Sequence, residues 1–114
     1  MKSIRGAIAV VDNNESSIIS SAKSLILSIM EENDITEEDV VFALFTVTQD
    51  LDQAFPAKAF RELGMVSVAA IDTVAPNIKD DLDGCIRILL TINNSKNDIK
   101  HVYLNDAKTL RPDR

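Results

Sequence analysis

The segment DLDQAFPAKAFRELG, residues 50–64, carries the signals of a short helix in the middle of the chain. Pro56 suits the first turn of a helix because it lacks an N–H group, and Gly64 suits a helix end because it tolerates positive φ. We therefore expect a helix over residues 57–63. Apolar segments typical of strands flank this helix, which indicates that helices and strands alternate along the chain.

A long amphipathic helix is predicted upstream, starting in the region of residues 12–15 and ending near Asn33. Apolar side chains recur there every three or four residues from Ile18 to Met30, which is the spacing of one helix face. Asp12 followed by Glu15 indicates the start of this helix. Burial of the apolar stripe in the core is its expected role.

Apolar and β-branched segments predict about five strands. A capping signal at Thr36 and Asp39 precedes the second of them. The strands are expected at residues 4–11, 40–47, 65–71, 85–92 and 100–104. Because no repeat, linker or low-complexity segment interrupts this pattern, residues 1–114 are predicted to form one α/β (α+β) domain with two main helices.

The composition argues against several classes of partner. The formal net charge is −6 and the pI is about 4.6, whereas nucleic acids and anionic membranes require an excess of basic surface. The sequence has no apolar run as long as a signal peptide or a membrane span, and its single cysteine, Cys85, fits a reducing compartment. We expect a cytoplasmic protein. A chain of 114 residues buries only a modest core, which favours an oligomer.

Few residues are available for nucleophilic or metal chemistry. One histidine, His101, one cysteine and three glycines provide no nucleophile motif, zinc site or phosphate-binding loop. The run KDDLDG, residues 79–84, lacks the acidic ligands that a calcium loop needs. Its aspartates are interpreted as a solvated loop: Asp80, Asp81 and Asp83. We expect neither a metal nor a cofactor.

Several cationic side chains are available to hold an anion. Arg87 and Arg5 lie within apolar strand patterns, and a buried guanidinium needs either a protein carboxylate or an anionic ligand. Lys58 and Arg61 are three residues apart and share one helix face. The predicted site for a small dianion consists of Arg5, Lys58, Arg61, Arg87, Tyr103 and Arg111.

Four parts of the sequence resemble the AroH-class, monofunctional chorismate mutases. They are IRGA at residues 4–7, DL..AFPAKAFREL at 50–63, CIRILLT at 85–91, and HVYL with LRPD at 101–104 and 110–113. They occur in the order of the family and span nearly the whole chain. The resemblance implies a homotrimer with a pseudo α/β barrel fold and active sites between neighbouring subunits. It also implies the cofactor-free rearrangement of chorismate to prephenate in aromatic amino-acid biosynthesis.

The resemblance implies roles for individual side chains as well. Arg87 would donate a hydrogen bond to the breaking ether oxygen, and Arg5 with Tyr103 would hold a carboxylate. A unimolecular, pericyclic rearrangement needs neither a nucleophile nor a general base, so the scarcity of catalytic residue types fits the reaction. The other substrate-binding residues would be Phe55, Ala57, Lys58, Arg61 and Arg111.

The chain departs from the family in one loop. The family carries a glutamate after the third strand that bonds the substrate hydroxyl, but no glutamate follows Glu62 here. Asp72 is the nearest carboxylate, and Thr73 occupies the position that spacing from FREL gives. Both are candidates to replace the glutamate, and a turn-capping role is the alternative for Asp72.

Three functions are compatible with these observations. The first is a chorismate mutase, with full or reduced activity. The second is a trimer that binds a small molecule or regulates without catalysis, which the altered loop favours. The third is a Rid-type trimer acting on reactive imines, but here only the expected architecture is shared and not the sequence motifs.

Overall fold

The computed structural model describes residues 1–94 and 98–109 of the chain. In chain order its elements are β1 (Lys2–Ala9), α1 (Glu15–Asn33), the 3₁₀ turn η1 (Glu37–Asp39), β2 (Val40–Val47), α2 (Lys58–Glu62), β3 (Ala69–Val74), β4 (Ile86–Ile92), β5 (Val102–Asn105) and the 3₁₀ turn η2 (Asp106–Thr109). This α+β arrangement agrees with the predicted count of strands and main helices.

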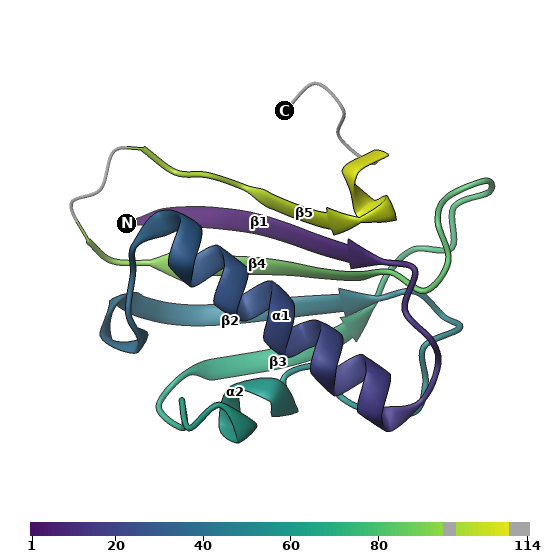
Figure 1. Cartoon of the computed structure of the whole chain (residues 1–114), viewed down its shortest axis with the longest axis horizontal. Coiled ribbons are helices and arrows are strands. Elements are labelled where there is room, and N and C mark those ends of the chain that lie inside the picture. The colour runs from purple at the N-terminus through teal and green to yellow at the C-terminus, as the bar shows by residue number, and fades with distance from the viewer. Residues whose placement is uncertain (95–97, 110–114) are drawn as a thin grey trace.

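The strands form a five-stranded mixed sheet in the order β3-β2-β4-β1-β5 (Figure 1). The central strand, β4, is antiparallel to both of its neighbours, β1 and β2. The two outer pairs, β2 with β3 and β1 with β5, are parallel. A parallel pair requires a crossover connection, and α2 lies in the connection between β2 and β3.

Helix α1 crosses one face of the sheet and supplies much of the core (Figure 1). It ends at Asn33, close to the predicted end, and its apolar stripe from Ile18 to Met30 is buried. The ring of Phe60 on α2 lies 5.9 Å, between centroids, from that of Phe45 on β2. Because Phe45 and the α1 stripe belong to the same buried cluster, both helices cover the same face.

The ends of α1 differ from the sequence prediction in one respect. The helix is capped by Asn14, whose side chain accepts the N–H of Ser17 at 2.7 Å, and not by Asp12. The cap precedes the first helical residue, Glu15, so the acceptor must stand at position 14. The second predicted capping signal is confirmed, because the Asp39 carboxylate accepts the Thr36 N–H at 2.9 Å.

Strand β3 lies later in the sequence than predicted. The third strand was expected at residues 65–71, but it covers Ala69–Val74, and residues 65–68 follow α2 outside any strand. Pairing with β2, rather than the apolar character of the segment, selects these residues. Asp72 and Thr73 are therefore strand residues and do not belong to the following loop. The other strand boundaries shift by a few residues, and β2 is confirmed as predicted.

The sheet face opposite α1 is only partly covered. A second small cluster of buried residues lies at one end of this face, and its members are Ala7, Ala9, Cys85 and Ala107. Strand alternation places Phe42 and Ile71 on the same face, where they are 41% and 66% exposed. Large exposed apolar side chains on one face are typical of a surface that meets a partner. None of the helices within residues 1–94 and 98–109 is long and apolar enough to cross a membrane.

Gly84 fixes the chain just before β4. Its carbonyl accepts the N–H of Val11 at 2.8 Å, and its N–H donates to the Asp50 carboxylate, with the shorter contact at 2.9 Å. Its φ is +59°, and a Cβ at this position would lie 2.7 Å from the Val11 carbonyl oxygen. The close backbone contact and the positive φ both require glycine.

Gly84→Ala should lower the free energy of unfolding by more than about 2 kcal/mol, because the left-handed backbone and the contact with Val11 both become unfavourable. Gly64→Ala is the matched control, since Gly64 has φ +81° but no atom within 4 Å of an added Cβ. We expect that variant to lose about 1 kcal/mol. Urea unfolding followed by circular dichroism measures both, and equal losses would contradict the account.

Candidate active site

A cationic hollow lies on the sheet face opposite α1. Register places Thr46, Arg87, Ala7 and Tyr103 side by side across β2, β4, β1 and β5. Arg5 follows on the same face, two residues before Ala7 on β1. These residues line a cavity of about 490 Å³. The small Ala7 side chain lies between Arg87 and Tyr103, which leaves room for a ligand above the strands.

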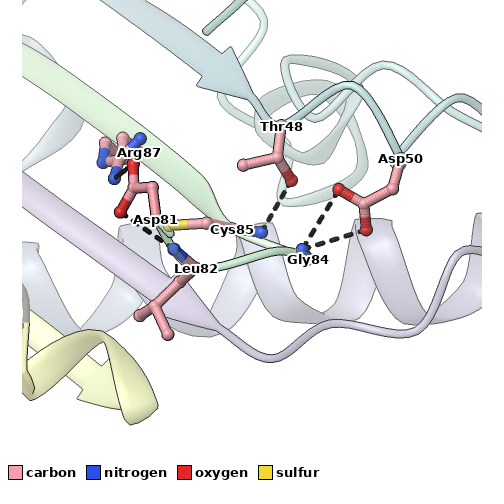
Figure 2. Close-up of polar contacts among 7 residues, drawn as sticks. All are labelled: Thr48, Asp50, Asp81, Leu82, Gly84, Cys85 and Arg87. Atoms are coloured by element: carbon pink, nitrogen blue, oxygen red, sulfur yellow. Dashed lines mark hydrogen bonds and ion pairs between the residues drawn. The ribbon is translucent and has the colours of Figure 1, made fainter. Parts of the chain in front are cut away.

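The Arg87 guanidinium has a carboxylate partner at the edge of this hollow. Its Nη2 donates to Asp81 Oδ2 at 3.1 Å, and each side chain is 31% exposed (Figure 2). The N–H of Leu82 donates to the other oxygen, Asp81 Oδ1, at 2.9 Å. These contacts, the Leu82 N–H first, lower the pKa of the Asp81 carboxyl, so it stays ionised at neutral pH.

Arg5 has a different environment. Its backbone N–H donates to His101 Nδ1 at 2.9 Å, which ties β1 to the chain just before β5. Its guanidinium has no carboxylate within ion-pairing distance among residues 1–94 and 98–109. From the sequence, each of the two arginines is expected to contact either a protein carboxylate or an anionic ligand. Arg87 has the carboxylate, and Arg5 is available for a ligand.

A second hollow lies on the other side of the molecule, beside α2. Its volume is about 540 Å³. The predicted site residues that line it are Phe55, Ala57, Lys58, Arg61 and Asp72. Phe55 is 74% exposed, which is unusual for an aromatic side chain without a partner. Lys58 lies 3.8 Å from both Glu15 and Glu62, and these partly exposed pairs contribute little stability.

Asp72 points to the α2 side of the sheet. It pairs with the buried Phe45 of β2, and its Oδ1 accepts the N–H of Ala57 at 2.9 Å. Burial raises the pKa of the Asp72 carboxyl, although the Ala57 N–H acts in the opposite direction. The contact satisfies the N–H of Ala57, which lies in the turn that leads into α2.

The structure therefore divides the predicted site residues between two faces. Arg5, Arg87 and Tyr103 line the hollow on the sheet, whereas the α2 residues and Asp72 line the other hollow. Thr73, on the edge strand β3, pairs with Thr46, so its side chain lies on the sheet face opposite α1. Arg111 lies outside the described residues.

Asp81 was missed by the sequence analysis. It was interpreted as part of a solvated loop, and Asp81 is exposed as expected, but its carboxylate also pairs with Arg87 and lines the sheet-face hollow. Asp80 and Asp83 are exposed as well. The spacing of Asp81 from Arg87 gives no helical or strand signal, so only the folded loop reveals the pair. Within the described ranges, no three His, Cys, Asp or Glu side chains are grouped as metal ligands.

The fold and the two hollows define a small α+β protein with cationic side chains in each hollow. All of the chain, residues 1–114, matches the family described as chorismate mutase type I. The chain belongs to this family, whose members are isomerases.

Similar proteins are also named chorismate mutases. The chorismate mutase AroH of Bacillus subtilis (strain 168) is 39% identical over 116 aligned residues, which cover 99% of this chain and 91% of that protein. The chorismate mutase AroH of Thermus thermophilus is 36% identical over 116 aligned residues, with 99% and 95% covered. A solved chorismate mutase from Clostridium thermocellum is 40% identical and superposes with a TM-score of 0.93, covering 96% of this chain and 99% of that one.

Asp72→Asn should make the protein more stable at pH 7. Because the folded-state pKa of Asp72 is raised, the folded protein binds this proton more tightly than the unfolded chain, and stability falls as pH rises through the folded pKa. The asparagine keeps an acceptor for Ala57 without the buried charge. The gain should shrink below the ordinary aspartate pKa of about 3.9.

Urea unfolding at pH 7 and at about pH 3.5 tests this pH dependence. Asp52→Asn is the contrasting variant, because hydrogen bonds from Asn13 and Gln53 lower the pKa of Asp52. It should lose stability at pH 7. A lower stability of Asp72→Asn than of wild type at pH 7 would contradict the assignment.

Proposed function

We propose that the chain catalyses the Claisen rearrangement of chorismate to prephenate, in aromatic amino-acid biosynthesis. Membership of the chorismate mutase type I family supports the reaction. The observation that carries the site is the hollow in which Arg5, Arg87 and Tyr103 meet. Chorismate is a dicarboxylate, and two guanidinium groups with a phenol suit a ligand of that charge and size.

The active site is proposed to be completed by a neighbouring subunit. The sheet-face residues and the α2 residues lie on opposite faces of one chain, so one subunit cannot bring both sets to the same ligand. A contact between two different faces is heterologous, and such contacts close into a ring when the rotation is right. A homotrimer is the proposed ring. The exposed Phe42, Ile71 and Phe55 then become buried between subunits.

Arg87 is the proposed catalytic residue. Its guanidinium would donate to the ether oxygen as the carbon–oxygen bond breaks, where negative charge develops in the transition state. Arg5 and Tyr103 would hold one carboxylate. From the neighbouring subunit, Phe55, Ala57, Lys58 and Arg61 would enclose the substrate in its compact conformer.

Rearrangement within one molecule requires no external electron or proton carrier, so no cofactor is assigned. Arg111 remains a proposed contributor to closing the site. Thr73 and Asp72 remain candidates to bond the substrate hydroxyl, and Asp72 would do so from the α2 side of the neighbouring subunit. A cytoplasmic location is proposed with this biosynthetic role.

A trimer that binds without turnover is the alternative function. The altered loop favoured it, because the glutamate of the family is absent. The sheet-face hollow nevertheless contains a carboxylate, Asp81, so the loss of the glutamate does not leave the site without one. The identities of 36–39% to two chorismate mutases over nearly the full chain favour the enzyme.

Arg87→Ala should lower kcat by about 10²–10³-fold, the loss typical of removing one donor to a developing oxyanion. Arg87→Lys is the matched control, because it keeps the positive charge without the planar fork, and its kcat should lie between the two. Chorismate consumption by ultraviolet absorbance, with prephenate confirmed as product, measures all three. Wild-type kcat in a folded Arg87→Ala protein would contradict the role.

Sedimentation equilibrium should give about three times the chain mass of 12.5 kDa. Phe42→Asp should reduce this mass, because a charge at a site buried between subunits costs several kcal/mol. Val10→Asp is the comparison, since Val10 is also exposed but lies beyond β1, outside the strand face that carries the hollow. A monodisperse wild-type monomer would contradict the shared site.

A further inference from the structure

The loop between β3 and β4 carries Asp81, a side chain to which the proposed reaction assigns no role. Arg87 lies in the middle of the sheet, and its register neighbours are Ala7 and Thr46. Both are too small to restrain a guanidinium. An unrestrained arginine side chain has about 2 kcal/mol of rotamer entropy. A substrate that ordered this side chain on binding would lose part of its binding free energy to that entropy.

Asp81 provides this restraint. Its Oδ2 accepts from Arg87 Nη2 at 3.1 Å, while Oδ1 accepts the Leu82 N–H at 2.9 Å (Figure 2). One carboxylate oxygen thus fixes the loop and the other fixes the arginine. A guanidinium has five N–H donors, so the contact with Asp81 leaves the others for a ligand in the hollow.

The loop that carries Asp81 is itself attached to the sheet. The Asp50 carboxylate accepts the Gly84 N–H, and Thr48 Oγ1 accepts the Cys85 N–H at 3.0 Å (Figure 2). Leu82 packs against the cluster that contains Ala7 and Ala9. The backbone on the β4 side of Asp81 is therefore held by residues that follow β2 and by the floor of the hollow. Asp81 can hold the Arg87 guanidinium in place only if its own position is fixed, and these contacts fix it.

We infer that Asp81 is a positioning residue of the candidate active site, which holds the Arg87 guanidinium in the place and orientation needed by the transition state. The inference rests on the proposed mutase activity. It assigns to the loop before β4 a support for Arg87 that Asp72, on the α2 side of the sheet, cannot give within the same chain. An ion pair in the hollow also weakens binding of a second anion, so positioning by Asp81 raises kcat without improving ground-state affinity.

Asp81→Asn tests the inference by steady-state kinetics on chorismate. The asparagine has nearly the same shape but loses the charge that holds Arg87, so kcat should fall about tenfold, the lower end of losses for supporting residues. KM should stay constant or decrease, because the repulsion of a dianion is removed. Asp81→Glu keeps the charge and should recover a large part of kcat.

Asp83→Asn is the matched control. It makes the same charge change two residues further along the loop, at an exposed side chain, and should have the kcat and KM of wild type. Circular dichroism and sedimentation establish that all variants have the fold and mass of wild type. A role confined to loop stability would change the melting temperature without separating kcat from KM.

Two outcomes would overturn the inference while leaving the proposed function intact. The first is wild-type kcat and KM in Asp81→Asn. The second is an unchanged kcat with a lower KM, which would mean that Asp81 only competes with the substrate for Arg87. Absence of turnover in wild type, Asp83→Asn and Asp81→Asn alike would overturn the proposed function, and with it the inference.

Discussion

Side chains on a β-strand alternate between two faces, and α1 covers only one face of this sheet. The face under α1 is packed with aliphatic residues and Phe45. The opposite face carries Arg5, Arg87 and Tyr103 over a floor made by small residues. This division allows guanidinium groups to sit on central strands without entering the core, where an unpaired charge would be costly.

The same alternation separates the two parts of the candidate active site. The α2 residues pack with the covered face, because Phe60 contacts Phe45, while the arginines belong to the other face. A catalytic cleft that needs both parts must be assembled from two subunits. Oligomerisation would then serve the core and the chemistry together, since a chain of 114 residues leaves large apolar side chains exposed on its own.

Features set by local patterns could be predicted from the sequence. The apolar stripe of α1 and the bounds of β2 follow from apolar periodicity and β-branched content, and the cationic residues Arg5 and Arg87 stand out because charge is rare in apolar strands. Features set by distant contacts could not be predicted. The observed β3 begins later than predicted, because its bounds are determined by pairing with β2 and its own side chains are largely exposed.

The Asp81–Arg87 pair escaped the sequence analysis for a related reason. Its geometry depends on where the loop before β4 is attached to Asp50 and Thr48, more than thirty residues away in sequence. The absence of a glutamate after Glu62 was visible in the sequence, but the position of a carboxylate in the hollow emerged only from the folded loop. Local sequence therefore indicated the candidate anion-binding side chains and gave no sign of the carboxylate that pairs with Arg87.

Complementation between two defective variants tests the central claim most directly. Subunits with Arg87→Ala and subunits with both Lys58→Ala and Arg61→Ala are co-expressed with different tags, and the mixed oligomers are purified by both tags. If each site uses the sheet face of one subunit and the α2 face of another, about one third of the sites in a trimer that contains both variants regain both intact faces. Chorismate turnover should then appear in mixed oligomers although each variant alone is nearly inactive. Mixed oligomers as inactive as their parents would contradict the shared site.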